Sequence, residues 1–408
     1  MRKSLLILAI FVACNPLHRE GIRRLSPASA GMDAQRLALI DSTAMASIAA
    51  GDVPGAVIGV VRGDALVYEK AFGNKSLVLE KEPMTVETLF DLASVSKCVG
   101  TTIAIMQLVE KGQVRLVDPV HKYIPGFKPW KDETTGEEVT ITVQDLLTHA
   151  SGLDASLPDV PGFVERNGSN CPDSLIRWIA TQSKRHFRPR TRQLYSCLNF
   201  ITLQHILEQV TGERLCDYAQ KHIFDVLGLQ HTTYFPLYDG APYRPDLTPL
   251  CAPTEQLADG HVLKAEVHDP TARLVNGGNS GNAGVFSTVE DLAVMCACLL
   301  NEGSLNGHRI LSPLTVRQMF RIPESNAPEV ARALGWDTYS LSPYTCGDVF
   351  NPTTVRGHTG YTGTSLILDL ETRTAVIILT NRVHPADSGS ATRLRSTVAS
   401  IVASAITD

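Results

Sequence analysis

The sequence predicts an α/β protein in which one mixed sheet is assembled from strands near both ends of the chain. Runs rich in β-forming residues occur near the N-terminus, over residues 54–73, and again near the C-terminus, over residues 364–382. The middle of the chain, about 94–300, instead carries helical patterns and turn-rich loops. We therefore expect a helical insertion in an α/β domain, with a functional site in the cleft between the two parts.

Length and composition fit one large globular unit or two closely packed ones. The chain has 408 residues, of which 44% are hydrophobic and 19% charged, and its formal net charge is -5. This composition is typical of a globular protein rather than of a disordered or polyanion-binding one. No basic patch is visible, so no nucleic-acid partner is expected.

The N-terminus predicts export. "MRKSLLILAIFVACNPLHRE" places two basic residues before an apolar run over 5–13 that is too short to span a bilayer, which is typical of a signal peptide. "FVAC" places Cys14 after a small residue and resembles the lipobox of bacterial lipoproteins. We predict a signal peptide at 1–13, lipidation of Cys14, a tether at 14–30, and a periplasmic or cell-surface lipoprotein held to the membrane by its lipid anchor only. Phe11 is an unusual first lipobox residue, so ordinary signal cleavage is the alternative.

The elements of the α/β part each have a local signal. Residues 33–50 predict an amphipathic helix. "PGAVIGVVRG" and "ALVYEKAFG" are separated by Gly63-Asp64, a hairpin signal. Near the C-terminus, "TSLILDL" and "TAVIILTNR" flank "ETR" as a second hairpin, and "ATRLRSTVASIVASAI" predicts a terminal helix.

The folded domain is expected over 31–408. Its α/β part would comprise about 31–93 and 301–408, and its helical part about 94–300. The helical part rests on five stretches: "TVQDLLTHA", "PDSLIRWIATQ", "LNFITLQHILEQVTG", "LCDYAQKHIFDVLG" and "TVEDLAVMCACLLNEG".

The cysteines after Cys14 are expected to be ordinary small core residues, because a domain of this size does not need disulfides. Cys296 and Cys298 lie in the apolar helical run "LAVMCACLL", which disfavours a zinc site, and no metal or organic cofactor is expected. The eight residues are Cys98, Cys171, Cys197, Cys216, Cys251, Cys296, Cys298 and Cys346.

The stretch "FDLASVSKCVGTTIAIMQLVEKG" contains the one S-x-x-K of the chain, Ser94 to Lys97, at the start of a predicted helix. Side chains at i and i+3 share a helix face, so Lys97 can lie beside the Ser94 hydroxyl, which needs a neighbouring base to become a nucleophile. For this role the lysine should be desolvated, with a lowered pKa. The alternative is a helix-capping serine followed by an unrelated lysine.

Two further motifs follow in order: "YSCLNF", which begins at Tyr195, and "RGHTGYTGTS", which contains His358-Thr359-Gly360 immediately before a strand. Together with the S-x-x-K they resemble the serine β-lactamase and penicillin-binding-protein superfamily, in the branch of class C β-lactamases, D-stereospecific peptidases and related esterases. "VPGAVIGVVRG", "ITVQDLLTHASGL", "GNAGVFSTVEDLA" and "ALGW" also match. The resemblance runs from about residue 31 to the C-terminus. It implies an antiparallel sheet flanked by helices, with a mostly helical second subdomain.

The resemblance also implies a two-step acyl transfer. Ser94 would attack a carbonyl carbon and form an acyl-enzyme, Lys97 would hold the hydroxyl, and Tyr195 would act as general base or proton shuttle. The backbone N–H groups of Ser94 and Tyr361 would form the oxyanion hole. The His358-Thr359-Gly360 segment would bind substrate.

Two departures weaken the implication of β-lactam hydrolysis. Class C β-lactamases carry asparagine where this chain has Cys197, and Asn199 lies in a different register. They also carry lysine where this chain has His358. Histidine is neutral for much of the time near pH 7, so the site lacks the fixed positive charge of that lysine. Esterases and peptidases of the branch often have histidine there. We therefore predict an exported serine hydrolase of the esterase or D-amino-acid peptidase type that acts on a small-molecule or peptidoglycan-derived substrate. A class C-like β-lactamase and a penicillin-binding sensor that stays acylated are the alternatives.

Other polar and aromatic residues have competing interpretations. Trp336 would line the substrate pocket or fill the core, and His149 would bond backbone in the core. His205 and Glu208 lack a third ligand, so we expect a solvated pair rather than a metal site. The polar residues of 279–282 would contact substrate or simply form a glycine-rich turn.

Overall fold

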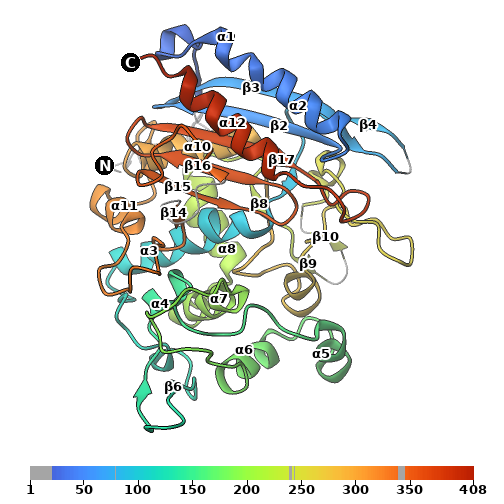
Figure 1. Cartoon of the computed structure of the whole chain (residues 1–408). Helices are drawn as coiled ribbons and strands as arrows, with labels where there is room; N and C mark the ends of the chain where they lie inside the picture. Colours follow the sequence, from blue (N-terminus) through green and yellow to red (C-terminus); the bar gives the residue numbers. More distant parts are fainter. Residues whose placement is uncertain (1–20, 79, 239–240, 243, 339–344) are drawn as a thin grey trace, which may run out of the picture.

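The computed structural model describes residues 21–78, 80–238, 241–242, 244–338 and 345–408. The predicted signal peptide and Cys14 lie outside these residues. Figure 1 shows a sheet built from the two ends of the chain, with helices on both of its faces and a helical part beside it. The predicted α/β class, with a sheet flanked by helices, is confirmed.

The main sheet has eight strands, and its central strands are antiparallel, as expected. The N-terminal hairpin pairs directly with the C-terminal one, because β2 lies beside β17 in the order β1-β3-β2-β17-β16-β15-β14. β1 pairs in parallel with β3, and β4 extends the other part of β3. The strands are β1 (Arg23–Arg24), β2 (Gly55–Arg62), β3 (Ala65–Ser76), β4 (Glu82–Pro83), β14 (Asp337–Thr338), β15 (Val355–Thr359), β16 (Ser365–Asp369) and β17 (Thr374–Thr380).

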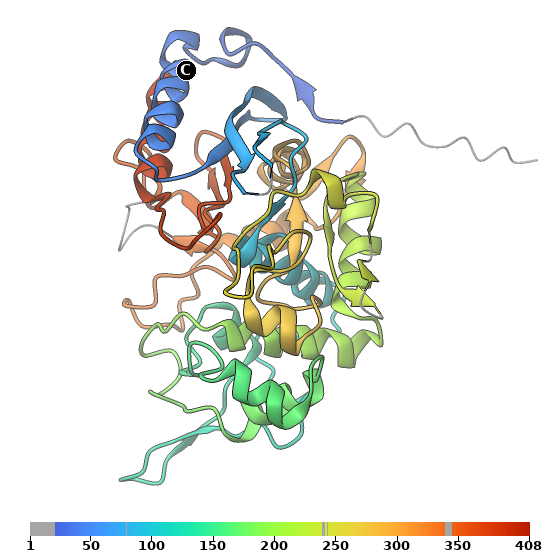
Figure 2. The same cartoon turned by 90° about the vertical axis from the view of Figure 1, so that its right-hand side faces the viewer.

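The central strands are buried on both faces, which explains why "GAVIGVVR" and "TAVIILT" are almost continuously apolar. Ile58 and Val60 of β2 face α1 (Ala34–Leu37), α2 (Leu39–Ala49) and α12 (Thr392–Ala405), whereas Val57 and Val61 face the opposite core. Figure 2 shows the blue α1 and α2 beside the red α12, so that helices from the two ends of the chain cover one face together.

Helix α10 (Val289–Leu300) covers the other face of the sheet, although it was placed in the predicted helical part. Its run "VEDLAVMCACLL" is buried on almost every side, because it lies between the sheet and the helical part. Gly59 of β2 permits this close approach: a Cβ there would lie 2.3 Å from Cγ1 of Val289. Within the stretch predicted as the helical part, α10 therefore packs directly on the sheet.

Most of the remaining helices lie below the sheet in Figure 1. The predicted long helix after Ser94 is built from three consecutive helical segments of different pitch: η2 (Ala93–Val95), η3 (Lys97–Thr102) and α3 (Ile103–Glu110). The others are α4 (Val143–Leu147), α5 (Val160–Asn167), α6 (Pro172–Thr181), α7 (Cys197–Thr211), α8 (Leu215–Ala219), η5 (Gln220–Phe224), α9 (Asp225–Leu227), η7 (Thr271–Val275) and α11 (Pro313–Phe320), with short turns η1 (Ala28–Ala30), η4 (Val120–Lys122) and η6 (Thr248–Leu250).

Small strand pairs connect these helices. A three-stranded sheet joins the segment before Ser94 to the middle of the chain, in the order β5-β11-β8. These strands are β5 (Phe90–Asp91), β8 (Thr233–Tyr234) and β11 (Val285–Ser287); the two-stranded pairs are β6 (Trp130–Lys131) with β7 (Glu138–Val139), β9 (Leu237–Tyr238) with β10 (Ala241–Pro242), and β12 (Ser304–Leu305) with β13 (His308–Arg309).

Part of the predicted tether belongs to the folded body. Ile22 is buried in the main core, and β1 pairs with Ala65 and Leu66 of β3. Arg24 forms ion pairs with Glu69, at 2.8 Å, and with Glu290 of α10, at 3.1 Å. Residues 22–24 therefore pack on the folded body, ahead of its predicted start at residue 31.

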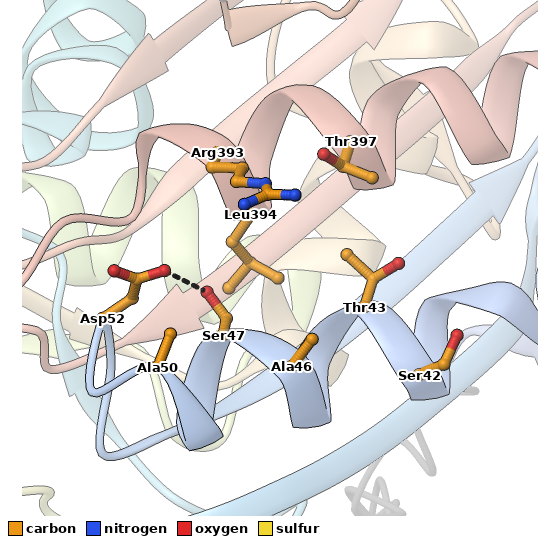
Figure 3. A pocket seen from close by; sticks show the side chains of 9 residues that line it. All are labelled: Ser42, Thr43, Ala46, Ser47, Ala50, Asp52, Arg393, Leu394 and Thr397. Carbon is orange, nitrogen blue, oxygen red and sulfur yellow. Dashed lines mark hydrogen bonds between the residues drawn. The ribbon is translucent and has the colours of Figure 1, made fainter.

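Helices α2 and α12 leave a shallow depression of about 400 Å³ between them (Figure 3). Most of its walls are alanine, serine and threonine side chains, with Asp52, Arg393 and Leu394 beside them, and Ser47 donates a hydrogen bond to Asp52 at 3.2 Å. None of the site residues predicted from the sequence lines it. We therefore place no chemistry there.

Two further findings concern the whole described chain. None of the helices found among the described residues is both long and apolar enough to cross a membrane. The eight described cysteines are unpaired, and within the described ranges no three His, Cys, Asp or Glu side chains gather as a metal site would require.

Candidate active site

Ser94 opens onto a cleft that consists of two adjoining cavities. The first, of about 690 Å³, we call the His358 half, and the second, of about 500 Å³, the Asp269 half. Both are lined by Ser94, Tyr195 and Tyr361, which therefore lie on the boundary. The His358 half also includes Gln193, Arg332, Asp337, His358, Thr359, Gly360, Arg382 and Arg395; the Asp269 half also includes Ala93, Cys197, Glu255, Leu257, His268, Asp269, Pro270, Arg273, Ala283 and Asp387.

The backbone in front of Ser94 is strained. Ala93 has φ 45°, a left-handed conformation that costs a residue with a Cβ about 1–2 kcal/mol. A hydrogen bond of 2.8 Å from the Ala93 N–H to Oδ1 of buried Asp91 holds it there. Oδ2 of Asp91 accepts from the His268 N–H at 2.7 Å, which ties this turn to the wall of the Asp269 half. Ser94, which follows this turn, lines both halves of the cleft.

Lys97 lies about one helical turn after Ser94, and its side chain is completely buried. Its Nζ donates to Ser94 Oγ at 3.0 Å, to the carbonyl oxygen of Asn282 at 2.8 Å and to Cys197 Sγ at 3.6 Å. An ammonium group has three N–H donors, and these three acceptors use all of them. Because Ser94 Oγ accepts from Lys97, the serine proton is free to be donated elsewhere.

The predicted lowering of the Lys97 pKa is wrong. Burial does lower the pKa of Lys97, but the acidic groups of Cys197 and Tyr195 beside it outweigh burial, so that its pKa lies above the usual value. Asp269 adds to this effect through its negative charge. Lys97 is therefore an ammonium ion at neutral pH and is not itself the base.

Tyr195 lies opposite Ser94 across Lys97. Lys97 Nζ is 4.9 Å from the centre of its ring, and its hydroxyl is buried. Burial raises the pKa of Tyr195, while the Lys97 ammonium and the hydrogen-bonding groups of Lys97 and Ser94 oppose that shift and thereby favour the phenolate. A buried hydroxyl that interacts with both Lys97 and Ser94 is suited to exchanging a proton with the serine.

His149 supports Tyr195 from behind. The two ring centroids are 4.4 Å apart. Nδ1 of His149 accepts from the Ser196 N–H at 3.0 Å and from the Asn199 amide at 3.1 Å, and burial lowers the His149 pKa well below its usual value. His149 is therefore neutral and bonds backbone in the core, as expected. Asn199, whose Oδ1 accepts from Ser151 at 2.6 Å, serves this support and does not line the cleft.

The end of β15 is fixed against the turn that carries Ser94. The hydroxyl groups of Thr362 and Thr364 donate to the carbonyl oxygens of Asp91, at 2.8 Å, and Leu92, at 2.9 Å. Gly360 leaves room for this contact, because a Cβ there would lie 2.5 Å from the Leu92 oxygen. The backbone after Gly360 and the start of the Ser94 helix are thereby held side by side.

His358 lines the cleft but is almost completely buried. Its Nδ1–H donates to the Thr359 carbonyl oxygen at 2.8 Å, so Nε2 carries the lone pair, and Nε2 has no partner among the described side chains and backbone. Burial lowers the pKa of His358 well below its usual value, and the cations Arg332 and Lys97 add to that shift. His358 is therefore a neutral hydrogen-bond acceptor and supplies no charge.

The family model described as Beta-lactamase matches residues 40–399, which is most of the chain. The chain belongs to the β-lactamase family. It is thus a serine hydrolase with the fold of β-lactamases and penicillin-binding proteins, as its motifs predicted.

Curated relatives and solved structures agree with this placement. A "Putative D-alanyl-D-alanine carboxypeptidase" of Escherichia coli (strain K12) is 29% identical over 94% of this chain and 92% of its own length. A protein of the same name from Salmonella gallinarum is 32% identical over 88% of this chain and 85% of its own length.

Among solved structures, "EstCE1, a hydrolase with promiscuous acyltransferase activity" has a TM-score of 0.71 at 23% identity and covers 90% of this chain and 99% of its own. An octameric penicillin-binding protein homologue from Pyrococcus abyssi has a TM-score of 0.66 at 22% identity, over 89% of this chain and 76% of its own. These likenesses concern the fold.

This member of the β-lactamase family departs from the class C pattern at Cys197. The thiol lines the Asp269 half and contacts Lys97, and burial raises its pKa, so the thiol is neutral at neutral pH. It offers a substrate only a weak donor. The side-chain amide of Asn282 lies close enough to Cys197 to oppose the shift of its pKa. Asn279 binds Glu208 at 2.9 Å, and Ser280 donates to Asn282 at 2.6 Å, so both serve the turn.

Of the two alternatives for Trp336, the packing supports the core position rather than the lining of the substrate pocket. The side chain is fully buried, packs edge-on against Phe320 with ring centroids 5.4 Å apart, and does not line the cleft. The same segment instead places Arg332 there, four residues earlier. Arg332 was missed in the sequence, although it adjoins the "ALGW" stretch that matched the family.

Arg332 is almost completely buried, and its guanidinium carbon is 5.6 Å from the centre of the Tyr195 ring. Its Nη1 forms an ion pair with Asp337, while Nε and Nη2 have no hydrogen-bond partner in the described part of the chain. Nε and Nη2 form one edge of the guanidinium plane, the edge that binds a carboxylate through two parallel hydrogen bonds. The His358 half therefore holds a cation ready for an anionic group.

Proposed function

We propose that this serine hydrolase is a D-amino-acid peptidase that removes a C-terminal residue with a free carboxylate through an acyl-enzyme on Ser94. The open edge of Arg332 carries the proposal. Buried donors without partners are costly, at about 1–3 kcal/mol each, and a substrate carboxylate would satisfy two of them at once. The names of the curated relatives, which concern D-alanyl-D-alanine peptides, support the same substrate class.

In the proposed acylation, Ser94 Oγ attacks the carbonyl carbon of the scissile bond and its proton passes to the Tyr195 phenolate. Lys97 remains an ammonium ion, and its positive charge stabilises the phenolate before transfer. The developing oxyanion is bound by the backbone N–H groups of Ser94 and Tyr361, whose positions the contacts of Thr362 and Thr364 support. Tyr195 then protonates the leaving amine, and the peptide bond breaks.

Deacylation repeats these steps with water as nucleophile. Tyr195, again a phenolate after protonating the leaving group, takes a proton from water as water attacks the acyl carbon. The proton returns to Ser94 Oγ when the ester bond breaks. Thr359 and the neutral His358 would contact the leaving group beside Arg332.

A class C-like β-lactamase is the second candidate, since β-lactams also carry a carboxylate that Arg332 would bind. β-Lactam hydrolysis is less well supported than the peptidase activity. Class C enzymes bind the side-chain amide of a β-lactam through an asparagine and its carboxylate through a lysine, whereas this chain has the neutral thiol of Cys197 and the uncharged His358 at those positions. We further propose that the chain is exported and lipid-anchored at Cys14, on the lipobox-like "FVAC".

Intact-protein mass spectrometry tests the proposal. Wild type and Ser94→Ala are each mixed with a D-alanyl-D-alanine peptide, a cephalosporin and an uncharged short-chain ester, and both the protein adduct and the released product are followed. We expect a transient adduct on wild type only, with fastest release of product from the peptide. A faster cephalosporin would favour the β-lactamase, an adduct that persists would favour a penicillin-binding sensor, and turnover by Ser94→Ala would refute the acyl-enzyme.

A further inference from the structure

The two halves of the cleft differ in charge. Three arginines and one carboxylate, Asp337, line the His358 half. Three carboxylates and one arginine line the Asp269 half: Glu255, Asp269, Asp387 and Arg273. The cleft is thus electropositive on one side of Ser94 and electronegative on the other.

Tyr361 separates the two sides. Its ring lies 4.7 Å from the Arg382 guanidinium and stacks on His268 with ring centroids 5.6 Å apart. Arg382 pairs with Asp387 at 2.6 Å, so these two charges neutralise each other at the boundary. The negative charge inside the Asp269 half therefore depends on Glu255 and Asp269.

The two carboxylates have different direct partners, although the charges of both act on Arg273. Glu255 lies 3.1 Å from His268 Nε2, whereas Asp269 has no ion pair within the described ranges. Oδ1 of Asp269 accepts the Ala272 N–H at 2.8 Å, which caps η7. Arg273, the cation of this half, directs its Nη1 to the carbonyl oxygens of Val267 and His268, at 2.7 and 2.8 Å.

The charge of Asp269 acts on the centre of the site. It raises the pKa of both Lys97 and Cys197, which shows that its field reaches the groups around Ser94. The same cavity is lined by Ser94 and Tyr195. A ligand that reaches from Ser94 into this cavity would therefore meet Asp269.

The proposed function gives the direction of this ligand, and the inference rests on it. If the leaving residue places its carboxylate on Arg332, the acyl part of the substrate extends to the other side of Ser94, into the Asp269 half. We propose that the Asp269 half is a subsite for a protonated amine on the acyl part, so that the preferred substrates are peptides with a free amino group close to the scissile bond. Such a substrate matches the cleft at both ends: anionic at Arg332 and cationic at Asp269.

Two peptides that differ only in this amine test the proposal. Both end in D-alanyl-D-alanine with a free carboxylate and carry lysine just before it; one has a free ε-amino group and the other has that group acetylated. We expect wild type to prefer the free amine by about tenfold in kcat/KM, as for a partly buried charge pair. The preference should weaken as salt is raised.

The variant Asp269→Asn then tests whether Asp269 binds the substrate amine through its charge or only supports the local structure. Asparagine keeps an oxygen for the Ala272 N–H, so the cap of η7 is retained. We expect the ratio of kcat/KM for the two peptides to fall below about threefold, with the loss falling mainly on the free-amine peptide. Asp259→Asn is the matched control: Oδ1 of Asp259 accepts the His261 N–H at 3.0 Å and the residue does not line the cleft, so the same chemical change there should leave the ratio unchanged.

The outcomes distinguish this inference from the proposed function. Equal kcat/KM for the two peptides in wild type would overturn the amine subsite while leaving the peptidase intact. An equal loss for both peptides in Asp269→Asn would assign Asp269 a purely structural role and overturn the subsite as well. Cleavage of neither peptide, with turnover of an uncharged ester, would overturn both the peptidase and the subsite.

Discussion

Replacing Arg332 by lysine should remove carboxylate recognition while leaving the site charged. Lysine retains a cation beside Asp337, so that carboxylate is not left alone in a buried position. It lacks the planar edge formed by Nε and Nη2, and it can offer a substrate carboxylate only a single point contact. The variant therefore isolates the geometry of the guanidinium from its charge.

The size of the effect follows from the bonds lost. Arg332 presents two unpartnered donors to the cleft, and lysine would replace them with one. A hydrogen bond to a charged group contributes about 2 kcal/mol, which corresponds to about a 30-fold change in kcat/KM. The loss should appear for a peptide with a free terminal carboxylate and should be much smaller for the same peptide ending in a carboxamide.

Steady-state kinetics on this pair of peptides gives the measurement. Arg382→Lys is the matched control, because Arg382 lines the same half but its Nη1 is engaged by Asp387 and by the Gly389 oxygen, at 2.6 and 3.0 Å. We expect the acid-to-amide ratio to fall in Arg332→Lys and to stay near the wild-type value in the control. If Arg332→Lys slowed both peptides equally, Arg332 would be a structural residue and the proposed substrate class would be wrong.

Three further predictions concern the reacting groups. Tyr195→Phe should lower kcat by roughly 10²–10⁴, the range for a lost general base, at an unchanged unfolding temperature; a loss below threefold in stopped assays would exclude Tyr195 from proton transfer. Because the pKa values of Tyr195 and Lys97 both lie above their usual ranges, kcat/KM should rise by about tenfold per pH unit from pH 7 to 9, as the phenolate fraction grows while the lysine stays charged; a flat profile would contradict this. Gly360→Ala should cost about 10²-fold in kcat/KM with unchanged circular dichroism, since the added Cβ would meet Thr364 Oγ1 at 2.1 Å and displace the strand end; wild-type activity would show that the contact is dispensable.

The sheet and the placement of Ser94 beside Lys97 followed from local patterns. Strand alternation, a hairpin at Gly63-Asp64 and an i,i+3 spacing each depend on a few neighbouring residues, so they are visible in the sequence. The approach of Tyr195 and His358 to Ser94 was accessible only through the resemblance of the motifs, because they lie more than one hundred residues apart in the chain.

Other features depended on neighbours that no local pattern reveals. The pKa of Lys97 was expected to fall because burial alone was considered; the thiol and phenol that reverse the shift come from the start of α7, far along the chain. Trp336 and Arg332 share one short segment, and only the packing shows that the aromatic side chain enters the core while the arginine faces the cleft. The N-terminal strand Arg23–Arg24 was read as tether because two residues carry no recognisable strand pattern.

By itself, the sequence determined the fold class, the family and the three side chains proposed for acyl transfer, since each is encoded by periodicity or by a short motif. Only the tertiary structure decided the electrostatics of the site: a cationic Lys97, a neutral His358, an open edge on Arg332 and an Asp269 without an ion pair among the described residues. The physical reason is that the charge of a side chain, and whether its donors and acceptors find partners, depend on all the groups within a few ångströms. Those groups come from segments that meet only when the chain folds.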